Sequence, residues 1–222
     1  MRSSSGRLRF WQDRSVTFTV LFVCTGNICR SPMAERLFKA RVRPDAPVVA
    51  TSAGTAAVVG HGMDGPSAIA LLELGGVPDG HFGRRVTTEL VHDSDLVLTA
   101  ESAHRSIIVS AHPLRFRKCF TMREFARLGA GLDSMAAPVT VDALRARVAE
   151  VADQRGQSDT AVGPAQDDIG DPYGAPLDIA RARAAQVAEA IDGLIQVLGL
   201  ARAASDTSRD TPSTAVYGRT PE

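Results

Sequence analysis

The stretch VTFTVLFVCTGNICRSPMAERL, residues 16–37, contains the pattern that decides the fold. Its first eight residues are all β-branched or apolar, which is typical of a strand buried on both faces of a parallel sheet. A short polar loop follows. Ser31 and Pro32 then suit the N-cap and the first position of a helix that runs to Val42. A strand that leads through a loop into a helix is the first half of a parallel α/β unit.

The rest of the chain repeats this alternation of strands and helices. Further strands are expected at 46–54, 94–100 and 118–122, and helices at 65–76, 101–113, 123–131, 140–155 and 177–200. Gly75 and Gly76 suit the C-terminal end of the helix at 65–76. The alternation predicts a parallel α/β sheet with right-handed crossovers.

Composition and charge exclude several classes of protein. The chain has 222 residues, enough for one sizeable domain, and its 44% hydrophobic and 23% charged residues are ordinary for a globular protein. A formal net charge of zero gives no nucleic-acid footprint, and no apolar run approaches the roughly 20 residues that span a bilayer. We expect a flexible N-terminal extension at 1–15, one domain at 16–200, and a disordered tail at 201–222.

The cysteines bear on the redox environment of the protein, and the histidines and cysteines together bear on metal binding. Three cysteines, Cys24, Cys29 and Cys119, do not make a secreted disulfide framework, so we expect a reducing, cytoplasmic location. The five histidines are scattered singly, and the His and Cys residues do not make up a set of four ligands with the spacing of a zinc site. We therefore expect no metal ion.

The loop from Cys24 to Ser31 has the features of an anion site. A loop that leaves the carboxyl end of a buried strand and enters a helix directs its amides to one point, and the helix dipole adds positive potential. Gly26 and Asn27 are residue types that accept a positive φ, which turns successive N–H groups inward. Arg30 adds a two-pronged donor that suits phosphate oxygens.

Cys24 stands at the start of this electropositive loop, where we expect a thiolate. A thiolate in a phosphate cradle is a nucleophile for phosphoryl transfer, and Ser31 could donate a hydrogen bond to its sulfur. A structural role as a small buried side chain would account for Cys24 alone, and a plain turn would account for the Gly-Asn pair alone. The loop at 24–31 contains neither of the glycine-rich nucleotide-binding motifs, G-x-x-x-x-G-K-[ST] and G-x-G-x-x-G.

The segment VCTGNICRSPMAE, residues 23–35, resembles the phosphate loop of low-molecular-weight protein tyrosine phosphatases, whose pattern is C-x5-R-[ST]. The resemblance extends more loosely through TSAGT, HFGR, SDLVLTAES and DPYG and covers residues 16–200. It implies one domain with a four-stranded parallel twisted sheet flanked by helices on both faces. It also implies hydrolysis of phosphotyrosine in proteins through a cysteinyl-phosphate intermediate, with no metal or organic cofactor, and a cognate tyrosine kinase as a further partner.

The same resemblance implies roles for individual residues. Cys24, Arg30 and Asp171 become the catalytic residues, with Asp171 of the DPYG loop as general acid and Tyr173 as an aromatic wall for the substrate ring. Asp167 and Asp168 are interpreted as solvated loop charges, one of which could tune the acid. The residues expected to bind phosphate or to support the loop are Thr25, Gly26, Asn27, Ile28, Cys29, Ser31 and Ser52. His81 and Arg84 either brace the outer shell of the loop or are ordinary packing residues.

Departures from the family pattern leave other activities open. Phosphotyrosine-specific members often carry an aromatic residue shortly after the SAGT segment, where this chain has AAVVGHG at 56–62, and a second aromatic where this chain has Gly174. The pocket could therefore be wider or less selective for aryl phosphates. Arginine phosphatases of the family tend to have Thr before the second loop cysteine, so Ile28 favours phosphotyrosine. Arsenate reductases need further cysteines near the end of the third strand, where Thr99 stands and Cys119 is the only distant cysteine.

Cys29 has two interpretations. It is either a small packing residue of the loop or a thiol that protects Cys24. The two cysteines are five positions apart in a tightly curled segment, so a disulfide between them could capture oxidised Cys24 before irreversible damage.

Overall fold

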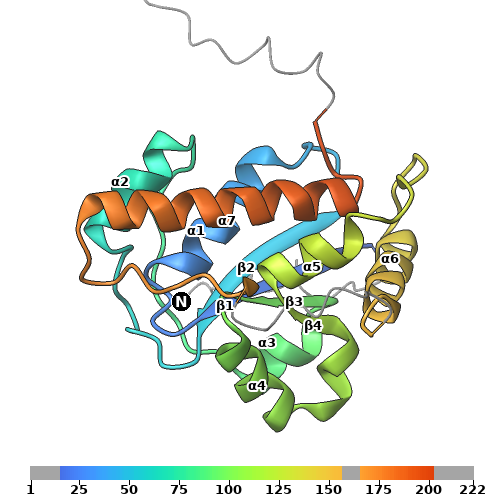
Figure 1. Ribbon diagram of the computed structural model, residues 1–222, viewed down its shortest axis with the longest axis horizontal. Coiled ribbons are helices and arrows are strands. Elements are labelled where there is room, and N and C mark those ends of the chain that lie inside the picture. The colour runs from blue at the N-terminus through green and yellow to red at the C-terminus, as the bar shows by residue number, and fades with distance from the viewer. Residues whose placement is uncertain (1–15, 157–165, 203–222) are drawn as a thin grey trace, which may run out of the picture.

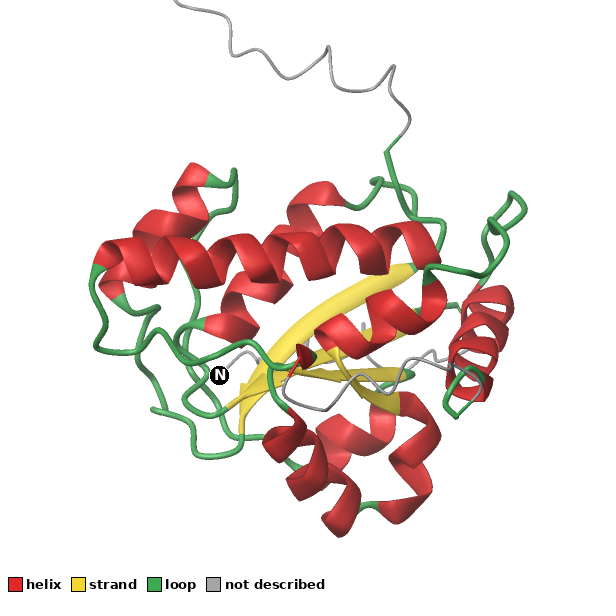
Figure 2. Cartoon of the chain, viewed as in Figure 1, coloured by secondary structure: helices red, strands yellow, loops and turns green. Residues whose placement is uncertain are grey.

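The structure is a computed structural model that describes residues 16–156 and 166–202. A parallel sheet lies between two layers of helices (Figures 1 and 2). Its strands, in the spatial order β2-β1-β3-β4, are β1 (Phe18–Cys24), β2 (Val48–Gly54), β3 (Leu96–Thr99) and β4 (Cys119–Thr121). The predicted fold class, a four-stranded parallel sheet with helices on both faces, is confirmed.

The helices divide between the two faces of the sheet (Figure 1). One layer contains α1 (Arg30–Arg41), α5 (Met122–Gly129) and the long α7 (Leu177–Val197), with α2 (Gly65–Glu73) packed against α1 and α7. The other contains α3 (Thr88–Asp93), α4 (Ser102–Ala111) and the 3-10 helix η2 (Pro113–Lys118), while α6 (Val141–Asp153) packs against η2 and α5. Neither α3 nor η2 was expected from the sequence. Both span only six residues and together bury one large apolar side chain, Val91, which is too little to give a helical periodicity.

The end of α2 has the geometry predicted for the two glycines. Gly75 adopts a φ of 81°, and its N–H donates to Leu72 O at 3.0 Å. The N–H of Gly76 donates to Leu71 O at 3.0 Å. This 6→1 and 5→2 pairing is a Schellman motif, which satisfies the last carbonyls of the helix.

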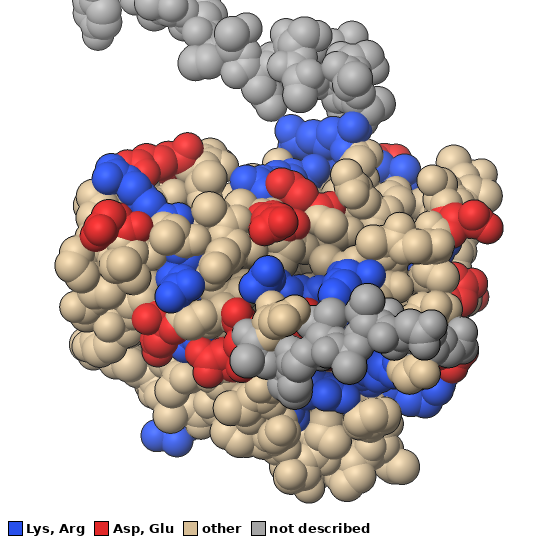
Figure 3. All heavy atoms as spheres, in the orientation of Figure 1, with Lys and Arg blue, Asp and Glu red and all other residues tan. Residues whose placement is uncertain are grey.

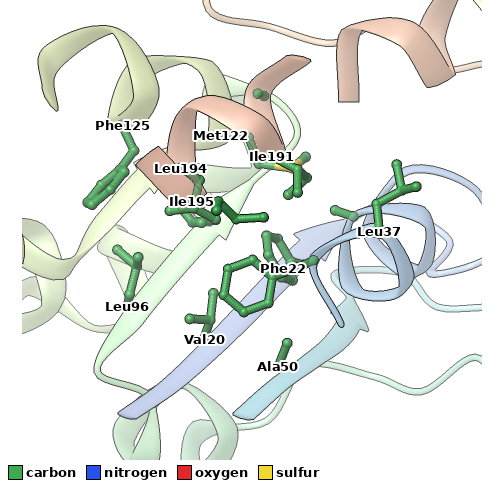
Figure 4. Close-up of a cluster of buried hydrophobic side chains, with 14 of the residues drawn as sticks. Val20, Phe22, Leu37, Ala50, Leu96, Met122, Phe125, Ile191, Leu194 and Ile195 are labelled. Atoms are coloured by element: carbon green, nitrogen blue, oxygen red, sulfur yellow. The ribbon is translucent and has the colours of Figure 1, made fainter. Parts of the chain in front are cut away.

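The larger hydrophobic core lies between the sheet and the layer of α1, α5 and α7. Figure 4 shows Val20 and Phe22 of β1 directed towards Leu37 of α1 and Ile195 of α7. All four side chains are buried. A smaller cluster on the opposite face joins Leu21, Val23, Val97, Cys119 and Ile108 with other side chains of that face. Because β1 is buried on both faces, alternate residues of its apolar run serve the two clusters.

The strand order sets the position of the candidate site. The chain passes from β1 to β2 on one side and then returns to β3 on the other side of β1. Parallel sheets bind ligands at the carboxyl ends of their strands, at such a reversal of direction. The loop that follows Cys24 starts at this point.

Several expectations concern segments outside the described residues. The predicted flexible extension at 1–15 lies outside them, as does the predicted tail apart from Ala201 and Arg202; Ala201 forms an isolated antiparallel bridge with Val42. In the part of the chain that the structure describes, no helix is long and apolar enough to cross a membrane, and no group of three or more His, Cys, Asp or Glu could hold a metal ion. Figure 3 shows acidic and basic side chains interspersed over the face that it draws.

Candidate active site

The loop between β1 and α1 turns its carbonyl groups outward. Five consecutive carbonyls, from Cys24 to Ile28, accept hydrogen bonds from neighbouring segments at 2.7–3.0 Å. Four of the donors are N–H groups of the segment 55–64, and the fifth is the ring of His81. Since the carbonyl and the N–H of one peptide unit point in opposite directions, this pattern directs the loop amides inward. The result is the concave row of donors that binds an anion.

Asn27 holds the loop in this shape. It is fully buried and has a φ of 54°, whereas Gly26, also expected to use a positive φ, does not adopt one. The left-handed residue of the loop is therefore Asn27. Its side-chain amide donates to Ser31 Oγ at 2.9 Å and to Ser52 Oγ at 3.0 Å, and its Oδ1 accepts from the N–H of Arg84 at 2.9 Å. One side chain thus links α1, β2 and the HFGR segment.

Ser52, His81 and Arg84 form a second layer behind Asn27. His81 Nε2 donates to Asn27 O at 2.7 Å, and Arg84 Nε donates to Ser52 O at 2.8 Å. Burial lowers the pKa of His81. Ser52 Oγ donates to Glu35 at 2.6 Å. Burial acts to raise the pKa of Glu35, but hydrogen bonds from a lysine of α1 and from Ser52 outweigh burial and lower it.

Cys24 lies at the end of β1, with only 2% of its surface exposed. Its Sγ is 3.0 Å from Ser31 Oγ, within hydrogen-bonding distance. The prediction that Ser31 is the N-cap of the helix is wrong, because α1 begins at Arg30 and Cys29 occupies the N-cap position without a side-chain cap. The hydroxyl of Ser31 is used instead inside the loop, where it contacts both Cys24 and Asn27.

Arg30 joins the loop to the segment that precedes α7. It is 2% exposed, and its Nη1 donates to Ile169 O at 2.9 Å. Its Nη2 lies 3.0 Å from Asp171 Oδ2, and Nη1 is also paired with Glu101. Burial among these oxygens fixes the guanidinium plane beside the loop.

Asp171 and Tyr173 are the exposed part of the site. The Asp171 side chain is 47% exposed, and its Oδ1 accepts from the N–H of Tyr173 at 3.2 Å. Tyr173 itself is 66% exposed, so its ring is free to meet a substrate. Gly174 has a φ of 72°, which lets the chain turn back towards α7 immediately after the tyrosine.

The interpretation of Asp167 and Asp168 as solvated charges is wrong. The Asp167 carboxylate accepts from Arg127 Nε at 3.1 Å and from Nη2 at 2.6 Å and is 8% exposed. Asp168 accepts from the N–H of Ser102 at 2.6 Å and from its hydroxyl at 3.0 Å. The donors lie 40 and 66 positions away in the sequence, which is why local composition could not identify these contacts.

Three residues of the site were missed by sequence reasoning. Glu101 pairs with Arg30, and His104 Nε2 is hydrogen-bonded to Thr25 Oγ1 at 2.8 Å. Burial lowers the pKa of His104. Gly54 lies so close to the loop that a Cβ there would be 2.4 Å from the carbonyl oxygen of Thr25. The sequence did contain a signal for Glu101, which directly follows the predicted strand at 94–100. The carboxyl ends of parallel strands meet at one edge of the sheet, so a residue at this position lies near the loop that follows Cys24.

The remaining loop residues are packed. Ile28 is 8% exposed, and Cys29 is 2% exposed with its pKa raised to about 12 by burial. A Cβ on Gly26 would be 3.3 Å from the Ile28 side chain and 3.7 Å from that of Val58. Val58 therefore stands beside the loop, in the segment where an aromatic residue was expected for a strict phosphotyrosine site.

Cys119 is remote from the loop. It begins β4, whereas Cys24 ends β1, and it belongs to the hydrophobic cluster on the opposite face of the sheet. It is fully buried, and burial raises its pKa to about 12. Thr99, at the position where an arsenate reductase would need a thiol, donates instead to Glu101 O at 2.9 Å.

Comparison with known proteins gives consistent results. A family model described as low molecular weight phosphotyrosine protein phosphatase matches residues 19–153. The chain is 39% identical over 95 residues to the low molecular weight protein-tyrosine-phosphatase Etp of Escherichia coli (strain K12). The aligned segment covers 43% of this chain and 62% of Etp. The chain thus matches less than two thirds of the length of this curated relative.

Two solved structures share the fold over most of their length. The YwlE arginine phosphatase from Geobacillus stearothermophilus has a TM-score of 0.60 and 28% identity, covering 82% of this chain and 93% of that chain. A low molecular weight protein tyrosine phosphatase from T. tengcongensis has a TM-score of 0.58 and 30% identity, covering 81% and 98% respectively. Both kinds of phosphatase are therefore built on this architecture.

Proposed function

The chain belongs to the low molecular weight phosphotyrosine protein phosphatase family, and we propose that it hydrolyses phosphotyrosine in proteins through a cysteinyl-phosphate intermediate. The observation that carries this proposal is the convergence of three groups on one anion-shaped loop. The sulfur of Cys24 begins the loop, Arg30 closes it, and the carboxylate of Asp171 lies 3.0 Å from Arg30 at the exposed mouth. A nucleophile, a fork for phosphate oxygens and a proton donor are the groups that phosphomonoester cleavage needs.

In the first step, the Cys24 thiolate attacks phosphorus in line with the tyrosine oxygen. The S–P bond forms as the P–O bond breaks, and protonated Asp171 gives its proton to the leaving oxygen. In the second step, the Asp171 carboxylate accepts a proton from a water molecule that attacks phosphorus. The S–P bond then breaks, which releases inorganic phosphate and restores the thiolate.

The loop amides and Arg30 stabilise the charge on the equatorial oxygens in both steps. This role depends on donors that are already in place before substrate arrives. Asn27 fixes the loop, and the contacts from Ile169 and Glu101 hold the guanidinium of Arg30 against it. The hydroxyl of Ser31, 3.0 Å from the sulfur, stabilises the thiolate as nucleophile and as leaving group.

The cellular setting is also part of the proposal. We propose that the protein acts in the cytoplasm on phosphotyrosine-containing proteins, opposite a cognate tyrosine kinase, without nucleic acid or membrane insertion. The small, odd number of cysteines supports a reducing compartment. We assign the activity to a single domain over residues 16–200.

Phosphoarginine is the second candidate substrate. It is favoured by the structural similarity to an arginine phosphatase. Against it stands Ile28, which puts an apolar side chain where arginine phosphatases of the family tend to have a threonine. Arsenate reduction is disfavoured because Cys119 is buried on the opposite face of the sheet from Cys24.

A parallel substrate comparison tests the proposal. The purified full chain is assayed without metal on a phosphotyrosine peptide, on a phosphoarginine peptide, and on arsenate with a thiol reductant, with Cys24→Ser as the matched control. We expect vanadate-sensitive turnover of phosphotyrosine that exceeds the other two and is absent from the control. Preferential turnover of phosphoarginine, or arsenate reduction, would replace the proposal with the corresponding alternative.

A further inference from the structure

Asp168 lies three residues before the candidate general acid and has no part in the mechanism described above. We propose that Asp168 is a positioning residue that fixes the general acid Asp171 by tying its loop to the first turn of α4. This inference rests on the proposed function, because it assigns a cause to the placement of the acid in that reaction.

The tie consists of two hydrogen bonds to one residue. Asp168 Oδ1 accepts from the N–H of Ser102 at 2.6 Å, and Oδ2 accepts from the Ser102 hydroxyl at 3.0 Å. Ser102 is the first residue of α4, whose N-cap Glu101 makes no side-chain cap. Asp168 therefore supplies, from a distant part of the chain, the carboxylate that satisfies an orphan N–H at the helix start.

The residues on either side of Asp168 are anchored as well. Asp167 is held by Arg127 through two contacts, and its carbonyl accepts from the hydroxyl of Thr121 at 3.1 Å. The N–H of Ile169 donates to Ala100 O at 2.9 Å, and its side chain is fully buried. The segment 167–169 is thus attached across the carboxyl ends of β3 and β4.

Asp171 itself has few constraints. Apart from its contacts with Arg30 and the N–H of Tyr173, its side chain makes no hydrogen bond or ion pair among the described residues, and it is 47% exposed. Gly170, the one residue between the anchored segment and the acid, has no side chain to hold it. The segment 167–169 therefore anchors the backbone of Asp171 on its N-terminal side, in addition to the ion pair of its carboxylate with Arg30.

The same turn of α4 also contacts the phosphate loop. Glu101 pairs with Arg30, and His104 is hydrogen-bonded to Thr25. The first turn of α4 therefore stands between the nucleophile loop and the acid loop and touches both. Asp168 is the side chain that attaches the acid loop to this shared support.

Geometry and charge make different predictions for substitutions at this position. Asn has the shape of Asp, and it can accept from the Ser102 N–H and donate to the Ser102 hydroxyl, so a geometric role survives Asp168→Asn. A role through the negative charge alone would be lost in Asn and Ala alike. Asp168→Ala removes both contacts.

The test measures kcat for two leaving groups, phenyl phosphate and dinitrophenyl phosphate. Phenolate needs a proton from the acid, whereas dinitrophenolate leaves without one. We expect Asp168→Ala to lower kcat for phenyl phosphate by about tenfold or more and for dinitrophenyl phosphate by less than about threefold. Inhibition by inorganic phosphate should change by less than about twofold, because the phosphate loop keeps its own contacts.

Two further variants complete the experiment. Asp168→Asn should recover most of the phenyl phosphate activity. Asp178→Ala, which removes an exposed carboxylate in the first turn of α7, should match the parent for both esters. Equal losses for both leaving groups in Asp168→Ala, or a failure of Asp168→Asn to recover, would overturn the inference. A parent enzyme that hydrolyses neither ester would instead refute the proposed function.

Discussion

Replacing Gly54 by alanine adds a single methyl group and should displace the phosphate loop. Gly54 ends β2 and pairs with Cys24 in the sheet. A Cβ at this position would be 2.4 Å from Thr25 O, 3.0 Å from Asn27 N and 3.1 Å from Ala57 Cα. All three neighbours are backbone atoms, so no side chain can rotate away to make room.

The size of the effect follows from these distances. An ordinary contact needs at least 3.4 Å, so the Thr25 carbonyl has to retreat by about 1 Å. Overpacking of this kind costs about 1–3 kcal/mol of unfolding free energy. A displacement of about 1 Å in a catalytic group can cost about 100-fold in rate, and here it would move the amides that hold the phosphate.

The assay combines urea denaturation with steady-state turnover of p-nitrophenyl phosphate. Gly131→Ala is the matched control, because a Cβ at Gly131 meets no atom within 4 Å. The control should keep full activity and be neutral or up to about 1 kcal/mol more stable. Gly54→Ala with the stability and turnover of the control would refute the claim that the loop packs directly on the end of β2.

The other predictions concern the phosphate-binding arginine, the acid, the protection of the nucleophile from oxidation and the support of the loop. Arg30→Lys should reduce kcat/KM by about 100-fold or more, because a point charge cannot replace the guanidinium fork; phosphate release by a purified, folded variant measures this. Asp171→Asn should lose more activity with phenyl phosphate than with activated aryl esters, and equal losses would remove Asp171 from the acid role. Cys29→Ser should turn over normally but lose activity irreversibly after peroxide, whereas the parent recovers with a thiol through a Cys24–Cys29 disulfide that mass spectrometry can detect. Burial lowers the pKa of His81 in the folded protein. The neutral imidazole therefore contributes fully to the free energy of unfolding above the pKa of the unfolded chain, about 6.5, and this contribution is lost as the pH falls through the pKa of the folded protein. The urea midpoint of the parent should drop between about pH 7.5 and about pH 5.5, and that of His81→Gln should drop less.

The parts of the fold that follow local patterns were predictable from the sequence. The apolar run of β1 and the glycines that end α2 could be recognised from neighbouring residue types alone. The four strands and the longer helices were likewise predicted in the right order, because each has its own periodicity and boundaries, whereas the six-residue α3 and η2 were missed. The proximity of Cys24 and Arg30 was predictable for the same reason, since the two residues flank one short loop.

The parts that depend on distant contacts were not predictable. Ser31 is a strong capping residue by type, yet its hydroxyl contacts Cys24 and Asn27, and the helix begins two residues earlier than predicted. Asp167 and Asp168 sit in a polar segment, and only the fold brings Arg127 and Ser102 to them. Tertiary contacts across many positions decide these cases, and residue type alone does not.

The most direct test of the central claim is the comparison of parent and Cys24→Ser on a phosphotyrosine peptide, with phosphate binding measured by calorimetry on the same preparations. We predict that the parent releases phosphate, and that Cys24→Ser releases none while it still binds inorganic phosphate, because the loop amides and Arg30 remain in place. Phosphate release by pure Cys24→Ser at the rate of the parent would contradict a cysteinyl-phosphate mechanism at this loop.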